Sequence, residues 1–157
     1  MRVIVDTRER APWTFEAQEG IRFSQGITTV RRKLESGDYS VDGLEDRVAI
    51  ERKSLDDWVG TVMRERSRFY RELDRLRAFE FRCVIIEASL RDVYAKRATS
   101  NANPDSILGF IAEVTVAQRV PVYLGGSRAE AQLLAAAFLK TAEKKLRVLI
   151  DGGESAG

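Results

Sequence analysis

The sequence predicts an α/β protein in which a central mixed β-sheet is flanked by α-helices. Strand-like segments come first as a cluster, and helical and strand-like segments then alternate along the chain. Its 157 residues are 44% hydrophobic and 32% charged, which is typical of one folded domain rather than a disordered chain. We therefore expect one domain over residues 1–150 and a disordered tail over residues 151–157.

Four strands are expected in the first third of the chain. "RVIVD" reads as a buried strand, and "ITTVRRKL" is rich in β-branched residues. "DYSV" and "RVAIERK" are two further strands, joined by a turn near "DGLED". Residues 13–26 show no clear period, so no element is expected there.

A helix is expected to follow these strands directly. Ser54 is placed as its N-cap and Asp57 at the third helical position, so the helix begins at Leu55. Its apolar stripe continues to Leu76, and the register of the stripe breaks near residues 65–67.

The second half of the chain alternates strands with helices. "FRCVIIEA" is a buried strand that places Cys83 in the core, and "SLRDVYAKRATSNAN" is a short helix with a polar loop. Pro104 opens the next helix, and "VPVYLG" is the last strand. Ser127 and Glu130 form a capping box for a long helix that ends near Lys145.

The composition excludes several classes of site. The chain has no histidine and one cysteine, which removes histidine-based triads and zinc sites built from histidine or cysteine. It has no glycine-rich phosphate loop. No apolar run reaches the length of a membrane span, and the start lacks a signal-peptide core, so we expect an intracellular protein without a membrane partner.

Charge is distributed unevenly, although the net charge is only +2. The segment "RERSRFYRELDRLR" concentrates arginines, namely Arg64, Arg66, Arg68, Arg71, Arg75 and Arg77. This pattern fits a solvated helix face with Glu–Arg pairs, and it equally fits contacts with phosphate groups.

The stretch "GDYSVDGLEDRVAIERKSLDD" brings two acids together. A turn that pairs Val41 with Val48 sets Asp38 opposite Glu51 and keeps the apolar faces of both strands in agreement. Lys53 lies one pleat further on the same face. Two carboxylates beside a lysine fit a Mg²⁺ site for phosphodiester hydrolysis, and the alternative is a surface hairpin with ordinary charged residues.

The same stretch closely resembles the signature of the XPF-type structure-specific endonuclease family. That signature is Gly-Asp, a spacer, Glu-Arg-Lys, three residues and Asp, and it is matched here by Gly37-Asp38, Glu51-Arg52-Lys53 and Asp57. "VDTRER" is similar to the family's first acidic element, with Asp6, Arg8 and Glu9. "RSRFYRELDRL", "CVIIEA" and "SILGFIAEVTVAQRVPVYLGG" resemble its later elements, so the likeness spans roughly residues 2–140.

The resemblance implies a restriction-endonuclease-like core of the PD-(D/E)xK superfamily that depends on Mg²⁺, with Mn²⁺ as a substitute. It implies that Asp38 and Glu51 are metal ligands and that the backbone carbonyl of Arg52 completes the protein side. Lys53 would handle the nucleophilic water. Asp6 would bind a second metal or position water.

Further residues take roles from the resemblance alone. Glu9 would line the site, and the side chains of Arg8 and Arg52 would shape it and contact phosphate. Asp57 would orient the network, or it would serve as a helix-capping residue. The expected contacts with nucleic acid are Arg8, Arg66 and Arg68.

Three other residues are expected to have no catalytic role. Trp58 and Tyr39 are expected in the core rather than against a base or a reacting group. Glu87 is read as the polar end of a strand rather than as a further carboxylate of the site.

The function expected from these features is a metal-dependent DNA endonuclease that cuts branched or flap DNA in repair or recombination. The alternatives are a non-catalytic DNA-binding or scaffolding partner of a nuclease complex and a restriction-like nicking enzyme. The family pairs through its nuclease domains, so a homodimer or a partner protein is expected. "SILGFIAEVTVA" and "AEAQLLAAAFLKTAEKKL" are candidates for that interface, and ordinary core packing is their other interpretation.

Overall fold

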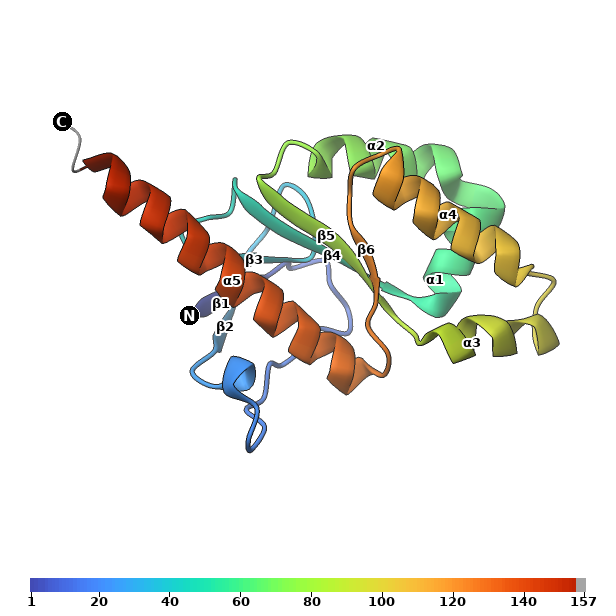
Figure 1. Cartoon of the computed structure of the whole chain (residues 1–157), viewed down its shortest axis with the longest axis horizontal. Helices are drawn as coiled ribbons and strands as arrows, with labels where there is room; N and C mark the ends of the chain where they lie inside the picture. Colours follow the sequence, from blue (N-terminus) through green and yellow to red (C-terminus); the bar gives the residue numbers. More distant parts are fainter. Residues whose placement is uncertain (155–157) are drawn as a thin grey trace.

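The computed structural model describes residues 1–154, in which six strands form one mixed sheet with helices on both faces (Figure 1). The strand order is β2-β1-β3-β4-β5-β6. Strand β3 runs antiparallel to β1 and β4, and the other neighbouring strands are parallel. The bounds are β1 Arg2–Val5, β2 Thr28–Arg31, β3 Tyr39–Val41, β4 Val48–Ser54, β5 Phe81–Glu87 and β6 Val122–Leu124. The predicted α/β class is confirmed.

The helices begin where the caps predicted. Their bounds are α1 Leu55–Gly60, α2 Arg66–Leu76, α3 Leu90–Ala95, α4 Pro104–Val116 and α5 Arg128–Glu154, with short 3₁₀ turns at Arg22–Ser24 and Lys96–Ala98. A π-helical turn over Thr61–Glu65 joins α1 to α2 and accounts for the break in the apolar stripe. None of these described helices has the length and apolarity that crossing a membrane requires.

The last helix is longer than the sequence predicted. It continues past Lys145 to Glu154, so residues 151–154 of the expected disordered tail are helical. Leu146 is fully buried against the sheet, and Arg147 pairs with Glu143 one turn earlier, which stabilises the extension. Residues 155–157 of that tail lie outside the described residues.

The sheet separates two hydrophobic clusters, one under α5 and the other under α1, α2 and α4. Alternate residues of β4 enter different clusters: Val48 and Ile50 face α5, and Ala49 faces the other layer. By the same alternation, Arg52 falls on the α5 side of the sheet, and Glu51 and Lys53 fall on the side of α1 and α2. Tyr39, Trp58 and Cys83 are fully buried, which confirms that all three belong to the core.

The register of the central hairpin is the predicted one. Tyr39 lies opposite Ile50, as a turn that pairs Val41 with Val48 requires. Gly37 precedes the strand with a φ of +77°, and a Cβ atom there would lie 3.1 Å from the Ile50 carbonyl oxygen. Only glycine fits this close approach without strain, which explains the glycine before Asp38.

Candidate active site

Backbone contacts fix Asp38 at the end of the hairpin. Its N–H donates to the carbonyl oxygen of Ile50, and its own carbonyl accepts from the N–H of Asp6, both at 2.8 Å. The carboxylate accepts one hydrogen bond, from the Arg52 N–H to Oδ2 at 2.7 Å. The side chain is therefore held toward β4 while its other oxygen remains available.

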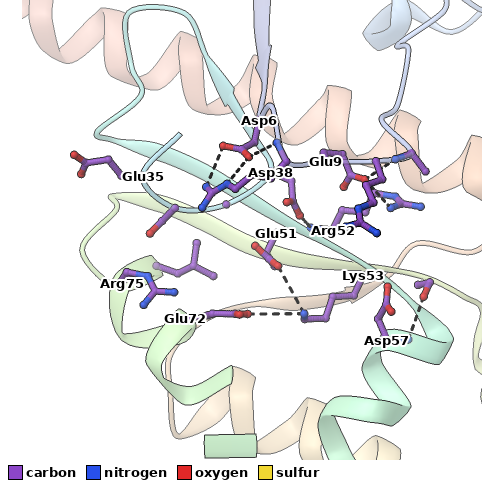
Figure 2. A pocket seen from close by; sticks show the side chains of 17 residues that line it. Asp6, Glu9, Glu35, Asp38, Glu51, Arg52, Lys53, Asp57, Glu72 and Arg75 are labelled. Atoms are coloured by element: carbon purple, nitrogen blue, oxygen red, sulfur yellow. Dashed lines mark hydrogen bonds and ion pairs between the residues drawn. The ribbon is translucent and has the colours of Figure 1, made fainter. Parts of the chain in front are cut away.

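Glu51 and Lys53 point from the same face of β4 toward α2 (Figure 2). The Lys53 Nζ lies 3.7 Å from Oε1 of Glu51 and 3.9 Å from Oε2 of Glu72. It also lies 4.7 Å from the centroid of the Phe69 ring, within the range of a cation–π contact. Two carboxylates and an aromatic ring from α2 and β4 thus surround the ammonium group.

Burial raises the pKa of both Asp38 and Glu51 above the ordinary carboxylate range. Repulsion from Glu9 adds to the rise in the pKa of Asp38, and repulsion from Asp38 adds to the rise in the pKa of Glu51. Two desolvated carboxylates side by side lower their energy by taking up a proton or a cation. The pair therefore favours the binding of a proton or a cation.

These groups line a cavity of about 540 Å³. Asp57 lies at its rim, and its N–H donates to the Ser54 hydroxyl oxygen at 3.1 Å, so Ser54 caps α1. The Asp57 carboxylate is exposed and takes no part in that cap. The described residues contain no preassembled group of three or more acidic, histidine or cysteine ligands for a metal.

Asp6 is placed differently from the expected metal ligand. Its Oδ1 accepts from the N–H and Nε of Arg8, and its Oδ2 accepts from Nη2 of Arg8 and the N–H of Leu34. Burial opposes ionisation, but these hydrogen bonds outweigh it and hold the pKa of Asp6 below its ordinary value. Four donors thus engage the two oxygens, and Asp6 anchors Arg8 and the Leu34 loop at the main cavity. Its role at a second metal or a water stays a prediction.

Arg52 lines the main cavity, and its side chain is engaged by two carboxylates. Its Nε and Nη2 donate to the two carboxylate oxygens of Glu87 at 2.7 and 2.9 Å, and its Nη1 lies 3.4 Å from Oε1 of Glu9. The side chain is 11% exposed. The guanidinium group is thus paired with Glu87 and Glu9 on the α5 side of the sheet.

Glu87 ends β5, as expected, and it is also the centre of an ion-pair cluster. Besides Arg52, it accepts from the indole Nε1 of Trp13 at 2.7 Å and from Nη1 of Arg128 at 3.2 Å. Arg128 also donates to the carbonyl oxygens of Ala11 and Pro12. The cluster ties two strands, the N-terminal loop and the start of α5 together. It borders the cavity of Asp38 and Glu51 through Arg52 and Ala11, whereas Glu87 itself does not line that cavity.

Of the three arginines expected to contact nucleic acid, two line cavities and one points away from them. Arg66 donates to the Val62 carbonyl oxygen and lies 4.8 Å from the ring centroid of Phe110 on α4, so it does not face the cavity. Arg68 lines an adjoining cavity of about 310 Å³ that also reaches Lys53. Arg8 is 61% exposed beside the main cavity.

Two site residues were missed from the sequence, Glu72 and Arg75. Both line the main cavity, from the face of α2 that looks toward β4. Oε2 of Glu72 is buried without a hydrogen-bond partner. The available signal was its position on the buried stripe between Phe69 and Leu76, where a charged residue is unexpected. Arg75 carried no such signal, because exposed arginines flank it on the same helix.

A mixed six-stranded sheet with paired carboxylates and a lysine on its central hairpin defines a restriction-endonuclease-like α/β core. The chain belongs to the ERCC4 domain family, whose model matches residues 5–138. The family membership predicted from the signature residues is therefore confirmed.

Solved structures show the same fold. XPF from Aeropyrum pernix is 20% identical over 90% of this chain, with a TM-score of 0.65. XPF from Aeropyrum pernix in complex with DNA is 19% identical over 92% of this chain, with a TM-score of 0.61. The chain spans 61% and 66% of the length of those two structures. No curated protein matches the sequence.

Proposed function

We propose that this chain is a metal-dependent DNA endonuclease that hydrolyses phosphodiester bonds at branched or flap DNA, in repair or recombination. The observation that carries the proposal is the half-buried Asp38–Glu51 pair with Lys53 beside it in one cavity. DNA is the favoured substrate because a protein of the same fold, XPF from Aeropyrum pernix, has been solved in complex with DNA.

The carboxylates suit a hard divalent cation. Among the described residues, hydrogen bonds and ion pairs engage one oxygen of Asp38 and one of Glu51, which leaves one oxygen of each for a ligand. Burial and mutual repulsion raise the pKa of both carboxyl groups, and a bound cation would offset both effects. Oxygen ligands of this kind hold Mg²⁺ or Mn²⁺. By the family resemblance, the Arg52 carbonyl would complete the protein side.

The residues around the carboxylates would divide the chemistry between them. Bound Mg²⁺ would lower the pKa of a coordinated water and neutralise charge that develops on the phosphate. Lys53 would donate a hydrogen bond to the attacking water or to a phosphate oxygen. Glu72 would keep the ammonium of Lys53 in place once Glu51 turns to the metal. Asp57 would orient groups at the rim.

The test uses a labelled set of single-stranded, duplex, 3′-flap, forked and nicked DNA with Mg²⁺ or Mn²⁺. Wild type should cut at least one member of the set in a metal-dependent way, and Asp38→Asn should abolish that cutting without changing the fold. Cutting that persists in the variant would contradict the proposal. The preferred substrate distinguishes a branch-cutting enzyme from a restriction-like nicking enzyme, which would favour linear duplex.

We propose that a second protein chain supplies part of the DNA affinity, either another copy or a partner protein. The match covers 66% of the length of the DNA-bound XPF structure, which therefore extends beyond the region that resembles this chain. Val116 at the end of α4 and Tyr123 on β6 are 76% and 38% exposed and offer apolar contact area. Light scattering of the purified chain, alone and with DNA, measures the assembly. An intracellular location is part of the same proposal.

A further inference from the structure

A second cleft continues the active-site cavity at one end. It has a volume of about 560 Å³ and lies between residues 33–36 and the C-terminal end of α2. It shares Glu35, Ser36 and Arg75 with the main cavity. Figure 2 shows Glu35 and Arg75 at the end of the main cavity that is far from Asp57. A strand that crosses the carboxylates therefore extends into this cleft.

The cleft has a largely apolar lining. Leu34 and Phe79 are 3% and 8% exposed, and Ala78 lies on the surface beside them. Ala78, together with the small exposed parts of Leu34 and Phe79, offers an apolar surface on which the face of a ring can rest without losing hydrogen bonds. The cleft is too small for a protein segment of any length and has the size of a small-molecule site.

Acidic and basic side chains surround the apolar part of the cleft. Glu35 and Asp46 are exposed acceptors, and a third acid, Glu45, is already paired with Arg32 at 2.6 Å. Carboxylates of this kind accept from the exocyclic amines of nucleobases. They disfavour phosphate, so phosphate is expected at the cationic end of the cleft rather than along its rim.

That cationic end is Arg75, which sits where the cleft joins the main cavity. It has no acidic partner in the part of the chain that the structure describes, whereas Arg77 on the same helix pairs with Asp74. A planar guanidinium without a partner is suited to a phosphate group. Lys33 adds a second exposed cation within the cleft.

We propose that this cleft is a subsite for one unpaired nucleotide adjacent to the scissile phosphate on the strand that is cut. Its phosphate contacts Arg75, its base lies over Ala78 beside the edges of Leu34 and Phe79, and its amines face Glu35 and Asp46. A base enters such a cleft only after it leaves the duplex stack. The subsite thereby selects DNA that is single-stranded beside the cut. This inference rests on the proposed function, because it takes the strand to be DNA.

Binding is tested without cutting, in the Asp38→Asn background with a fork that carries 2-aminopurine at one position at a time around the branch point. Seating of the base in the cleft should raise the fluorescence at one position. Ala78→Trp fills the cleft and should remove that rise, whereas Ala129→Trp, at an exposed alanine of α5, should keep it. Flat fluorescence at every position, with DNA bound, overturns the subsite.

Cutting is tested with an abasic nucleotide at that same position. It should lower kcat/KM about tenfold for wild type, within the range that contacts with single bases contribute, and should have no further effect on Ala78→Trp. Arg75→Gln should raise KM, and Arg71→Gln, at another exposed arginine of the helix, should not.

The outcomes separate the two proposals. Normal cutting that is indifferent to every abasic position overturns the subsite and leaves the endonuclease intact. A position-specific fluorescence change without any metal-dependent cutting supports the subsite and overturns the endonuclease.

Discussion

Strand β4 carries two adjacent residues, Glu51 and Arg52, whose surroundings are opposite in character. On the α5 side, Arg52 meets Glu87 through two hydrogen bonds and Glu9 through a third contact. On the other side, Glu51 faces the like charge of Asp38 and has one ion pair, with Lys53, at 3.7 Å. The charged residue on the α5 side thus has close partners of opposite charge, whereas the carboxylate on the other side has one distant partner and a neighbour of like charge.

The carboxylates on the two sides show the same difference. Burial opposes ionisation of Glu87, but Arg52 and Trp13 outweigh it and lower the pKa of Glu87 below its ordinary value. Burial and the charge of Asp38 raise the pKa of Glu51. The comparison teaches that stability lies where buried charges are paired, and that capacity to bind a ligand lies where they are not.

The largest effect is expected from Glu51→Gln, which removes a negative charge from the cavity side of β4. Cleavage should fall about 10³-fold, the scale of losing a central electrostatic group. Stability should stay constant or rise, because repulsion with Asp38 is relieved. Cleavage rates and urea unfolding measure the two effects, with Glu19→Gln at an exposed position as control. A strongly destabilised variant would contradict the comparison.

Arg52→Met removes the cation from the α5 side of β4. It should lower the free energy of unfolding by about 3 kcal/mol, because Glu87 and Glu9 are left as buried charges without their partner. The double variant Arg52→Met/Glu87→Gln should recover part of that loss. Chemical denaturation of both variants gives the coupling, and additive losses would show that the pair is not a unit.

Glu72→Ala tests whether Lys53 needs its second carboxylate. The expected result is a loss of about tenfold in kcat with KM unchanged, because the ammonium loses one of its two supports. Glu72→Gln retains an acceptor and should restore most of the rate. Equal losses in both variants would point to a role of charge rather than position.

The smallest effect concerns pH in the absence of metal. The folded pair binds protons more tightly than the unfolded chain, whose carboxylates have pKa values of about 4. The contribution of this pair to stability is therefore fully present below about pH 4 and is lost as pH rises toward about 8, the raised pKa of Glu51. The thermal midpoint should drop by about 3 °C over this window.

Saturating Mg²⁺ should flatten this profile, because the metal binds the ionised carboxylates. Glu51→Gln should flatten it without metal. A midpoint that rises with pH in metal-free wild type would show that the pair is not the dominant titrating group.

Much of the fold and the centre of the site could be read from local sequence. Caps at Ser54 and Ser127 located helix starts, and the alternation of apolar residues fixed the register that opposes Asp38 and Glu51. These features depend on residues a few positions apart, so the chain carries them wherever it folds. The helix end was harder to predict, since Leu146 supports α5 through contacts with the sheet.

The sequence by itself determined that a pair of acids and a lysine would share one face of a hairpin. Only the tertiary structure decided which other charged groups are free to act. Asp6 accepts from a loop N–H 28 residues away, Arg52 donates to a carboxylate 35 residues away, and Glu72 on helix α2 reaches Lys53 on strand β4. Competition between distant side chains for the same hydrogen bonds has no period along the chain, so it is settled only when the elements pack.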